Sequence, residues 1–517
     1  MNKLYFGDNL DILKSLHKEH PKGFIDLIYI DPPFNSKRNY NVLFEAVELN
    51  DTKAQKEAFA DTWSNVSYID TLNEILELNK NIYDFLRALD KISTSKASVS
   101  YLTTMTIRII YMHRLLKDTG SFYLHCDPTM SHYLKMICDL IFGWNSFQNE
   151  IIWLRTTNTG SSKAIANKFS SDTDTILYYV KSPKFVFNKI YKEYGKDYFE
   201  RFKFEDEKGH YRWQAMKTYS SDKLKELEST NRLRYSKNGK PEYKQYVETL
   251  KGVSLNNLWS DIFHINPMAS ERLGYPTQKP EALLERIINA SSNEGDLVAD
   301  FFCGCGTTIA VAQKLKRDWI GVDISHLAVK LMVNRLVNSF GETVNKTFEI
   351  FGFPKDIDSA KELAENTSGG RLKFEEWIVE VMLHGVLNEN RTQMGYDGYF
   401  TFDVQGDKHI GMIEVKSGNA TPNHLNHFIK TVESNNGHIG IFVCFEKQIK
   451  NSMLKIAKDE GYYSEAMFGN HYPKIQIISV ENLMKGENIL VPVSTKTTFK
   501  AAPKEIKKSN QGKLDLT

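Results

Sequence analysis

The chain has 517 residues, 41% of them hydrophobic and 25% charged, with a formal net charge of +2. This composition suits two or three domains with sizeable cores and excludes disordered, collagen-like and disulfide-stapled proteins. The five cysteines show no CxxC zinc spacing. No apolar run reaches the roughly 18 residues of a membrane span, and the first residues lack a signal-peptide core. We therefore expect a cytoplasmic protein without a membrane partner.

Two strand–helix units bracket the first two-thirds of the chain. LYF leads into GDNLDILKSLH, and the apolar run FIDLIYI ends at residues 31–34; near residue 300, GDLVADFF leads into CGCGTT, a helical run, and the short strand WIGVDIS. Short apolar runs that alternate with turns and helices are typical of a parallel α/β sheet. Residues 45–95 have a helical, polar pattern that predicts an insertion.

Residues 151–260 form a basic and aromatic stretch, with 21 Lys and Arg against 13 Asp and Glu, and 19 Phe, Tyr and Trp. Such a stretch suits a surface that neutralises phosphates and stacks on bases. The alternative is a solvated charged face over an ordinary core. Arg155 and Lys163 are the candidate phosphate contacts.

The first chemical motif is Asp31-Pro32-Pro33-Phe34, directly after a buried-looking strand. Two prolines fix φ and remove donors, so their carbonyls are held rigidly beside the Asp31 carboxylate. A carboxylate and a carbonyl together can accept both hydrogens of an exocyclic NH₂ group, and Phe34 offers a flat face to a base taken out of the duplex. The alternative is a rigid turn after a strand.

The second motif runs from Asp300 to Thr308 and joins a strand to a helix through CGCG. Glycines let a ligand approach the backbone closely. The pattern is not GxGxxG, so a dinucleotide is not expected. Asp323 ends the next strand, where an acid can bind ribose hydroxyls. A nucleoside-like cofactor without phosphates fits, with S-adenosylmethionine as the candidate; a tight strand–helix turn is the alternative.

Together the motifs resemble the amino-methyltransferases of DNA, in the β-class order in which DPPF precedes FxGxG. The resemblance extends from Tyr5 to about Val337 and includes the segments GDNLDIL, GSFYLHCDP, NLWSDI and YPTQKPEALLERIINASSNEGDLVADFFCGCGTT. Over this range the chain is similar to type III modification subunits. It implies a seven-stranded Rossmann-like sheet entered in its middle by the N-terminus, with residues 151–260 as the target-recognition region. It also implies catalytic roles for Asp31, Pro32, Pro33 and Phe34.

The same resemblance implies a set of residues around S-adenosylmethionine, at the ends of strands and in the TQKP loop. Asp8 is expected near the adenine, and Gly304 and Gly306 let the cofactor pass; the full set is Asp8, Thr277, Lys279, Pro280, Asp300, Phe302, Gly304, Gly306, Thr307 and Asp323, with Gln278 beside them. His125 and Asp127 of HCDP are either close to this site or part of a strand-end turn. Asp31 at the first motif position favours N6 of adenine over N4 of cytosine.

The third motif places Gly395-Tyr396-Asp397-Gly398 before a strand, with Glu414 and Lys416 on the next. Asp397 and Glu414 could hold Mg²⁺ through oxygen ligands, and Lys416 lies on the same strand face as Glu414. This resembles Mrr-like PD-(D/E)xK restriction domains, over about residues 371–485. The alternatives are a fold kept only to bind DNA, and a surface hairpin with ordinary charges. Glu380 is a weaker candidate for an additional acid.

The expected organisation follows from these segments. Residues 1–345 form the methyltransferase domain, 346–370 a linker, 371–495 an α/β restriction-endonuclease-like domain, and 496–517 a basic disordered tail. The expected function is site-specific methylation of DNA in a restriction–modification setting. Candidate partners are double-stranded DNA, a second copy of the chain and a restriction subunit. The rival hypotheses are a solitary methyltransferase and a catalytically inactive DNA-binding module.

Overall fold

The computed structural model describes residues 2–33, 65–92, 96–156, 169–266, 268–275, 277–354, 356–365, 370–383, 385–388, 391–404, 407–464 and 471–492. Residues 187–257 form a compact unit separate from the remainder of the chain. The described residues form three parts: the large sheet with its helices, the 187–257 unit, and the C-terminal sheet.

The large sheet has nine strands within the described residues, in the order β12-β4-β5-β3-β2-β13-β14-β1-β15. The pairings β3–β2, β2–β13, β13–β14, β14–β1 and β1–β15 are parallel, while β5 runs antiparallel to both β3 and β4. The strands are β1 Asn2–Phe6, β2 Ile25–Ile30, β3 Leu116–Cys126, β4 Phe147–Leu154, β5 Thr173–Val180, β12 Leu258–Trp259, β13 Leu297–Asp300, β14 Asp318–Asp323 and β15 Phe348–Phe351.

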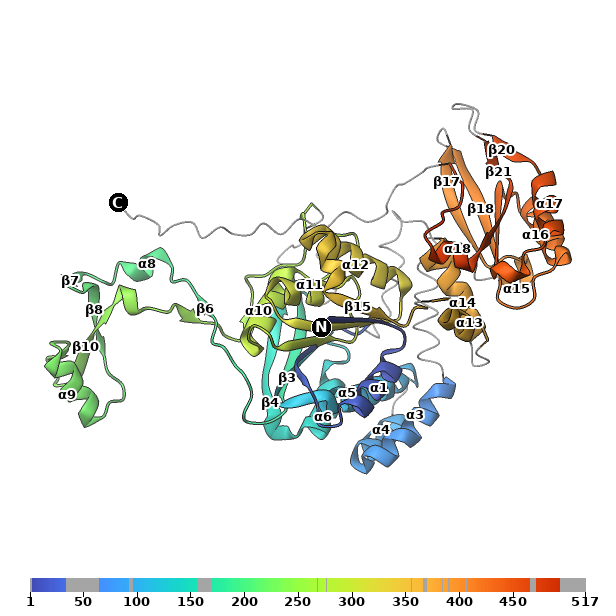
Figure 1. Ribbon diagram of the computed structural model, residues 1–517. Helices are drawn as coiled ribbons and strands as arrows, with labels where there is room; N and C mark the ends of the chain where they lie inside the picture. The colour runs from blue at the N-terminus through green and yellow to red at the C-terminus, as the bar shows by residue number, and fades with distance from the viewer. Residues whose placement is uncertain are drawn as a thin grey trace. The chain divides into compact units, whose positions relative to one another are not determined.

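Helices cover both faces of this sheet, because the central strands are apolar on both sides (Figure 1). In β2, Ile28 and Ile30 face one core while Leu27 and Tyr29 face the other. The first core is closed by α1 Asn9–Glu19, α3 Asn65–Leu78, α4 Lys80–Ile92, α5 Lys96–Leu115 and α6 Ser131–Phe142. The second is closed by α10 Glu281–Ser291, α11 Thr307–Lys314 and α12 His326–Phe340.

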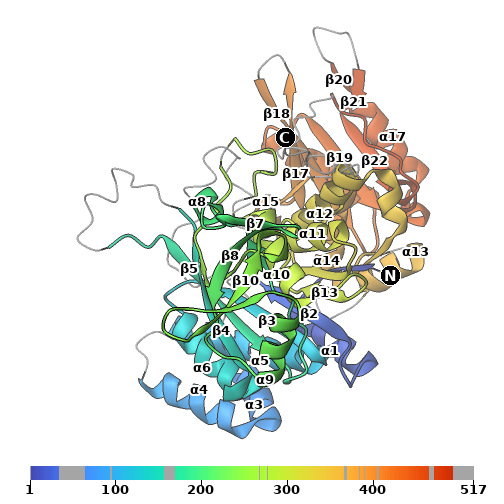
Figure 2. The same ribbon diagram turned by 90° about the vertical axis from the view of Figure 1, so that its left-hand side faces the viewer.

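Three expectations about this part need correction. The sheet has nine strands rather than seven, and β1 lies second from one edge rather than in the middle. The predicted linker contains β15, which pairs with β1, and helix α13 Ile357–Glu365. The described part of the expected 45–95 insertion forms helices, among them α3 and α4 (Figure 2), but its Leu72, Ile75 and Leu86 pack into the main core.

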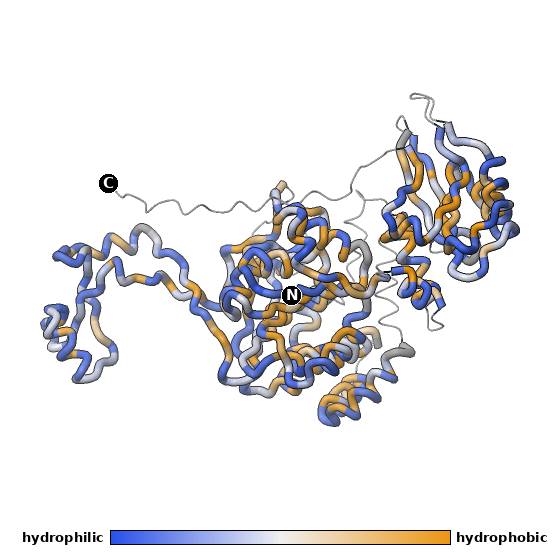
Figure 3. Tube along the Cα trace, in the orientation of Figure 1, coloured by the Kyte–Doolittle hydropathy of each residue, from blue (hydrophilic) through white to orange (hydrophobic). Residues whose placement is uncertain are grey.

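The 187–257 unit is built on a small antiparallel sheet in the order β7-β8-β10-β9. Residues 151–186 of the predicted target-recognition region belong instead to the large sheet, because β4 and β5 there are apolar strands. The unit itself has few strongly hydrophobic segments (Figure 3). Its elements are β6 Tyr191–Lys192, α8 Lys196–Phe199, β7 Phe204–Asp206, β8 Gly209–Ala215, α9 Ser221–Ser229, β9 Leu233–Tyr235, β10 Pro241–Tyr246 and β11 Val253–Ser254.

The C-terminal part is a five-stranded sheet in the order β16-β17-β18-β19-β22, apolar on both faces. Residues 370–387 contain α14 Gly370–Glu376, a π-helical turn Trp377–Met382 and the short strand β16. The other elements are β16 Val386–Leu387, α15 Arg391–Met394, β17 Gly398–Val404, β18 Asp407–Lys416, α16 Pro422–Ser434, β19 Ile439–Cys444, α17 Asn451–Asp459, β20 Tyr462–Ser464, β21 His471–Pro473, β22 Ile475–Ser479 and α18 Val480–Met484. The predicted tail at 496–517 lies outside the described residues.

Candidate active site

Four acids stand at the carboxyl ends of parallel strands of the large sheet. Asp8 follows β1, Asp31 follows β2, and Asp300 and Asp323 are the last residues of β13 and β14. Because β2, β13, β14 and β1 are consecutive in the sheet and parallel, all four acids lie at the same edge. Ligands bind at this edge in open α/β sheets, which makes it the candidate active site.

Asp31 is held from one side only. Lys279 pairs with one carboxylate oxygen, while the other, Oδ1, is buried and accepts no hydrogen bond in the described part of the chain. Pro32 is buried and Pro33 half-buried. Phe34, the last residue of the motif, lies outside the described residues. A buried acceptor without a donor is costly, so Oδ1 is a place where a ligand N–H would be stabilised.

The loop from Cys303 to Thr307 is fixed by the two strand-end acids. The Asp300 carboxylate accepts hydrogen bonds from the Phe302 N–H (2.9 Å) and the Thr308 hydroxyl (2.6 Å). Asp323 accepts one from the Gly304 N–H (2.8 Å). Asp300 is 2% exposed, so its carboxylate shapes the loop from within the core. Phe302, by contrast, is half-buried.

Burial sets the ionisation of these acids. It raises the pKa of Asp300 to about 7, with further contributions from Asp31 and Asp323. It also raises the pKa of Asp323 to about 6. Both shifts follow from the cost of a negative charge away from water. Asp300 and Asp323 therefore hold their protons more tightly than solvated carboxyls do, and a positively charged ligand beside them would favour their ionised forms.

The two loop glycines are required by backbone geometry and packing. Gly304 has φ of 52° and Gly306 of 73°, values that favour glycine. A Cβ on Gly306 would lie 2.5 Å from Met332 Cγ of α12, and a Cβ on Gly304 would lie 3.1 Å from the Tyr275 ring. The expectation that both glycines serve only to let a cofactor pass is therefore incomplete, because Gly306 is pressed against α12.

The TQKP loop meets the glycine loop from the other side. Leu273, Cys305 and Leu331 form a small apolar cluster against which Tyr275 packs. Thr277 is exposed, Lys279 reaches Asp31, and Pro280 caps the start of α10. Tyr275 was not anticipated from the sequence, although it directly precedes the PTQKP pattern. Burial, helped by Asp323, raises its pKa.

Two buried basic residues also escaped the sequence prediction. Arg108 of α5, 5% exposed, donates to Asp8 (2.9 Å) and to Asn9 (2.5 Å), and Asn9 donates to the Phe301 carbonyl (2.8 Å). The second is Arg335 of α12, which joins the glycine loop to α10. Nothing local in a helical sequence distinguishes such an arginine from a solvated one.

The HCDP segment divides into two structural roles. His125 is buried between the Tyr29 hydroxyl (3.0 Å) and the Asp174 carboxylate (3.1 Å). Although burial opposes it, His125, Arg155 and Lys279 lower the pKa of Asp174. Asp127 forms the strand-end turn, where it accepts hydrogen bonds from Thr129 and from the Met130 N–H.

The basic and aromatic side chains of the 187–257 unit largely pack on one another. The Arg234 guanidinium lies 4.3 Å from the centre of the Trp213 ring, and Lys244 Nζ lies 4.7 Å from that of Tyr211. Lys244 also pairs with Asp206 (2.7 Å). Part of the composition that suggested DNA binding thus stabilises a unit with little apolar core. Arg155, outside the unit, pairs with Asp174 (3.0 Å), and Lys163 lies outside the described residues.

In the C-terminal part, Asp397 directly precedes β17, and Glu414 lies in β18, the strand that pairs with β17. Asp397 accepts a hydrogen bond from the Val415 N–H (2.7 Å), and Glu414 pairs with Lys416. Burial, with Asp397 as the next cause, raises the pKa of Glu414 to about 7, and Glu375 of α14 takes part in the same interaction. Glu375 is therefore a helical acid that interacts with the pair, and the role of Glu380 stays a prediction.

The residues that the structure describes lack two features. They contain no group of three or more His, Cys, Asp or Glu side chains arranged to hold a metal ion. They also contain no helix long and apolar enough to cross a membrane.

Comparison with known proteins agrees with the site geometry. The N6/N4 methyltransferase family, described as DNA methylase, matches residues 25–334, more than half of the chain. The chain therefore belongs to the N6/N4 family of DNA methylases. It is similar to type II and type III modification methylases. The family does not account for the C-terminal sheet, which lies beyond the matched residues.

Individual relatives match the same part of the chain. Type II methyltransferase M.EcaI of Enterobacter cloacae is 28% identical, over 65% of this chain and 69% of the relative. The StyLTI Mod subunit, a type III restriction-modification enzyme of Salmonella typhimurium, is 26% identical over 61% of this chain and 50% of its own length. DNA adenine methyltransferase YhdJ of Escherichia coli is 28% identical over 64% of this chain and 81% of its own length.

Similar solved structures include the M1.HpyAVI–SAM complex, with 17% identity, 65% of this chain and 99% of that chain covered, and a TM-score of 0.32. Another is the cytosine-N4-specific PvuII DNA methyltransferase, with 14% identity, coverage of 64% and 86%, and a TM-score of 0.35.

Proposed function

We propose that the chain transfers a methyl group from S-adenosylmethionine to the exocyclic amine of a base in double-stranded DNA, and that this amine is N6 of adenine. The observation that carries this proposal is the Asp31 carboxylate, whose Oδ1 is buried and has no hydrogen-bond donor among the residues that the structure describes. Pro32 and Pro33 follow it, and neither can donate a backbone hydrogen bond. An NH₂ group is the ligand that such an acceptor-only site selects.

The proposed catalytic roles follow from this arrangement. Asp31 accepts one N–H of the target amine, and a proline carbonyl accepts the other, so both hydrogens are engaged. The nitrogen lone pair is then less conjugated with the ring and is directed toward the methyl donor. Phe34 stacks on the base once it has left the duplex. Lys279 holds the Asp31 carboxylate in place through their ion pair.

The residues at the strand ends fit the cofactor. Asp8 and Asp323 offer carboxylates to the adenosine moiety. Gly304, whose φ is positive, has no side chain, so its backbone next to Tyr275 stays uncovered. When bound, S-adenosylmethionine supplies the methyl group on a positively charged sulfur, which suits an edge rich in carboxylates. We propose Asp8, Thr277, Lys279, Pro280, Phe302, Gly304, Gly306 and Asp323 as its surroundings, with Asp300 and Thr307 shaping them from within.

Adenine is favoured over cytosine by Asp at the first motif position and by the likeness to a relative named as an adenine methyltransferase. N4 of cytosine is the alternative target, since it too is an exocyclic amine. The likeness to type II and type III modification enzymes supports a restriction–modification setting. The 187–257 unit is the proposed target-recognition region, and a restriction subunit or a second copy of the chain are candidate partners.

The direct experiment is to incubate the purified chain with tritiated S-adenosylmethionine and mixed-sequence DNA. The DNA is then digested to nucleosides and separated. Label in N6-methyladenine supports the full proposal, label in N4-methylcytosine corrects the base, and no transfer under any condition overturns the function. Sequencing the modified positions also gives the recognition site.

A second candidate function is Mg²⁺-dependent cleavage of DNA by the C-terminal sheet. The observation that favours it is the interaction of Asp397, Glu414 and Glu375, whose pKa values burial raises together, beside Lys416. Asp397 and Glu414 would hold the ion, which would polarise the scissile phosphate. A fold that only binds DNA is the alternative. Incubating supercoiled plasmid with the chain and Mg²⁺ or EDTA separates the two, because only the first predicts nicking.

A further inference from the structure

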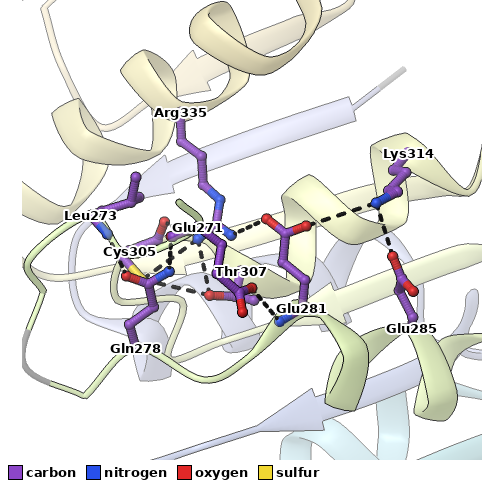
Figure 4. Close-up of polar contacts among 9 residues, drawn as sticks. All are labelled: Glu271, Leu273, Gln278, Glu281, Glu285, Cys305, Thr307, Lys314 and Arg335. Atoms are coloured by element: carbon purple, nitrogen blue, oxygen red, sulfur yellow. Dashed lines mark hydrogen bonds and ion pairs between the residues drawn. The ribbon is translucent and has the colours of Figure 1, made fainter. Parts of the chain in front are cut away.

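Arg335 is a charged side chain buried inside the methyltransferase part. It lies on α12 and is 2% exposed. Its guanidinium donates hydrogen bonds to Glu281 Oε1 (2.7 Å), Thr307 Oγ1 (3.0 Å) and the Cys305 carbonyl (3.4 Å), as Figure 4 shows. A buried guanidinium with several partners is expensive to disturb, so these contacts fix the relative position of the groups that make them.

The partners of Arg335 stand at the starts of two helices. Glu281 is the first residue of α10, directly after the TQKP loop, and Thr307 is the first residue of α11, directly after the CGCG loop. One side chain on a third helix therefore joins the ends of the two loops to which the proposed function assigns the cofactor.

The TQKP loop is in turn tied to Glu281. The Glu281 N–H donates to Glu271 Oε2 (3.0 Å), Gln278 Nε2 donates to the Glu271 carbonyl (2.6 Å), and the Leu273 N–H donates to Gln278 Oε1 (2.8 Å) (Figure 4). Lys279, adjacent to Gln278, pairs with Asp31. A chain of contacts thus runs from Arg335 through this loop to the proposed catalytic carboxylate.

We propose that Arg335 is a positioning residue for S-adenosylmethionine, acting through Glu281 and Thr307. By holding the two loops at a fixed separation, it keeps the cofactor surroundings formed before the cofactor binds. The planar guanidinium bonds acceptors in two directions at once, which a single ammonium group cannot reproduce. The inference rests on the proposed function, since it concerns the cofactor of that reaction.

The chain contains a matched control. Arg317 is also buried, at 9% exposed, and it joins the same two helices at their other ends. It donates to the Ser292 hydroxyl (3.2 Å) and carbonyl (2.9 Å) after α10, and to the Leu315 carbonyl (2.7 Å) after α11. Arg317 and Arg335 therefore share a structural task, but only Arg335 is next to the loops.

The test uses the full chain with Arg335→Lys, Arg317→Lys and Glu281→Gln. Binding of S-adenosylmethionine and of S-adenosylhomocysteine is measured by calorimetry without DNA, and Tm is measured by scanning fluorimetry. We expect both lysine variants to lower Tm. Arg335→Lys and Glu281→Gln should weaken binding of both ligands on the order of tenfold or more, whereas Arg317→Lys should leave it within about threefold. At saturating DNA, the KM for S-adenosylmethionine should rise more than kcat falls.

Unchanged affinity in folded Arg335→Lys, with a loss of Tm like that of Arg317→Lys, would overturn the inference and leave Arg335 a purely stabilising residue. If Arg335→Lys does not fold, Glu281→Gln decides, because it keeps the side-chain volume and removes the charge that pairs with Arg335 (2.7 Å) and, at the longer distance of 3.9 Å, with Lys314. Failure of the parent chain to bind S-adenosylmethionine would instead overturn the proposed function. The two failures are therefore distinguishable.

Discussion

Lys279 and Asp31 form an ion pair at the carboxyl edge of the large sheet although 248 residues separate them in the chain. Their side chains are only 14% and 15% exposed, so the pair is screened less than a surface pair. Lys279 engages one carboxylate oxygen, and the described part of the chain supplies no donor to Oδ1. The pair therefore orients an acid and keeps its acceptor available, as the proposed contact with a target amine requires.

Asp31→Ala should abolish methyl transfer while binding of S-adenosylmethionine remains near normal. The lost contact should be worth a few kcal/mol, and each 1.36 kcal/mol is a factor of about ten in rate. Radiolabel transfer to DNA and calorimetry measure the two effects. Asp26→Ala is the control: Asp26 lies in β2, the strand that Asp31 follows, and pairs with Lys117, so its loss should lower Tm and spare the rate. Methylation by Asp31→Ala within tenfold of the parent would contradict the assignment.

Gly306→Ala should weaken cofactor binding by displacing the glycine loop. Its φ is 73°, and the new Cβ would lie 2.5 Å from Met332 Cγ, so the loop or α12 must shift. The control is Gly341→Ala, with φ of 83° and no atom within 4 Å of the new Cβ, which isolates the backbone strain. We expect both variants to lower Tm and only Gly306→Ala to lower the affinity for S-adenosylhomocysteine. The branched side chain of Gly306→Val should cause a still larger loss, because it adds atoms to the same crowded position. Equal affinities in the two alanine variants would refute the crowding argument.

The buried Asp300 carboxyl should make stability fall as pH rises from about 4 to about 7. Its pKa is raised from 3.8 to about 7 in the folded chain, so in this range the folded state keeps a proton that the unfolded state releases. The unfolding free energy then decreases with pH, by about 4 kcal/mol at most. Asp300→Asn, which can still bond Phe302 and Thr308, should flatten this part of the profile. Melting curves from pH 4 to 8 without cofactor test this, and an unchanged profile in the variant would contradict it.

The sequence was informative about the strand ends and uninformative about what surrounds them. Asp31, Asp300 and Asp323 each follow a short apolar run, and the structure places all of them at one edge. Arg335 and Arg108 carry no such signal, because an inward-facing arginine on a helix depends on partners that arrive from distant segments. Thr307, expected beside the cofactor, is buried and bonded to Arg335.

Segment boundaries were missed for a related reason. β15 is only four residues long, Phe348–Phe351, and becomes a strand because β1 lies beside it, so residues 346–370 were interpreted as a linker. The start of the target-recognition region was set by composition from residue 151, whereas β4 and β5 belong to the large sheet. Composition averages over such strands and cannot separate them from the adjoining unit.

Affinity for DNA should fall steeply with salt, because lysines of the 187–257 unit would displace counterions from phosphates. Lys217, Lys237 and Lys240 are exposed, unlike Lys244, which packs on Tyr211. Reversing these three charges to Glu should weaken DNA binding and reduce the slope of log K against log salt, without changing cofactor affinity. Lys80→Glu, on the exposed surface of α4, is the control. A binding constant that stays flat from about 50 to 200 mM salt would refute the phosphate contacts.

If Asp397, Glu414 and Lys416 form a metal site, Glu414→Gln should remove Mg²⁺-dependent cleavage and leave methylation intact. Gln keeps the shape of the side chain but lacks the charge that a divalent cation requires. Glu433→Gln is the control, since Glu433 is a half-exposed carboxylate of the same part and only pairs with Lys474 (3.6 Å). Unmethylated and fully methylated plasmids, each with Mg²⁺, Mn²⁺ or EDTA, measure cleavage.

A chain that both methylates and cuts DNA must distinguish its own DNA from other DNA, so cleavage should depend on methylation. Methylation either blocks cleavage or is required for it. If both plasmids stay supercoiled while methyl transfer is active, the C-terminal sheet binds DNA or a partner without cutting, and the single-chain nuclease hypothesis fails.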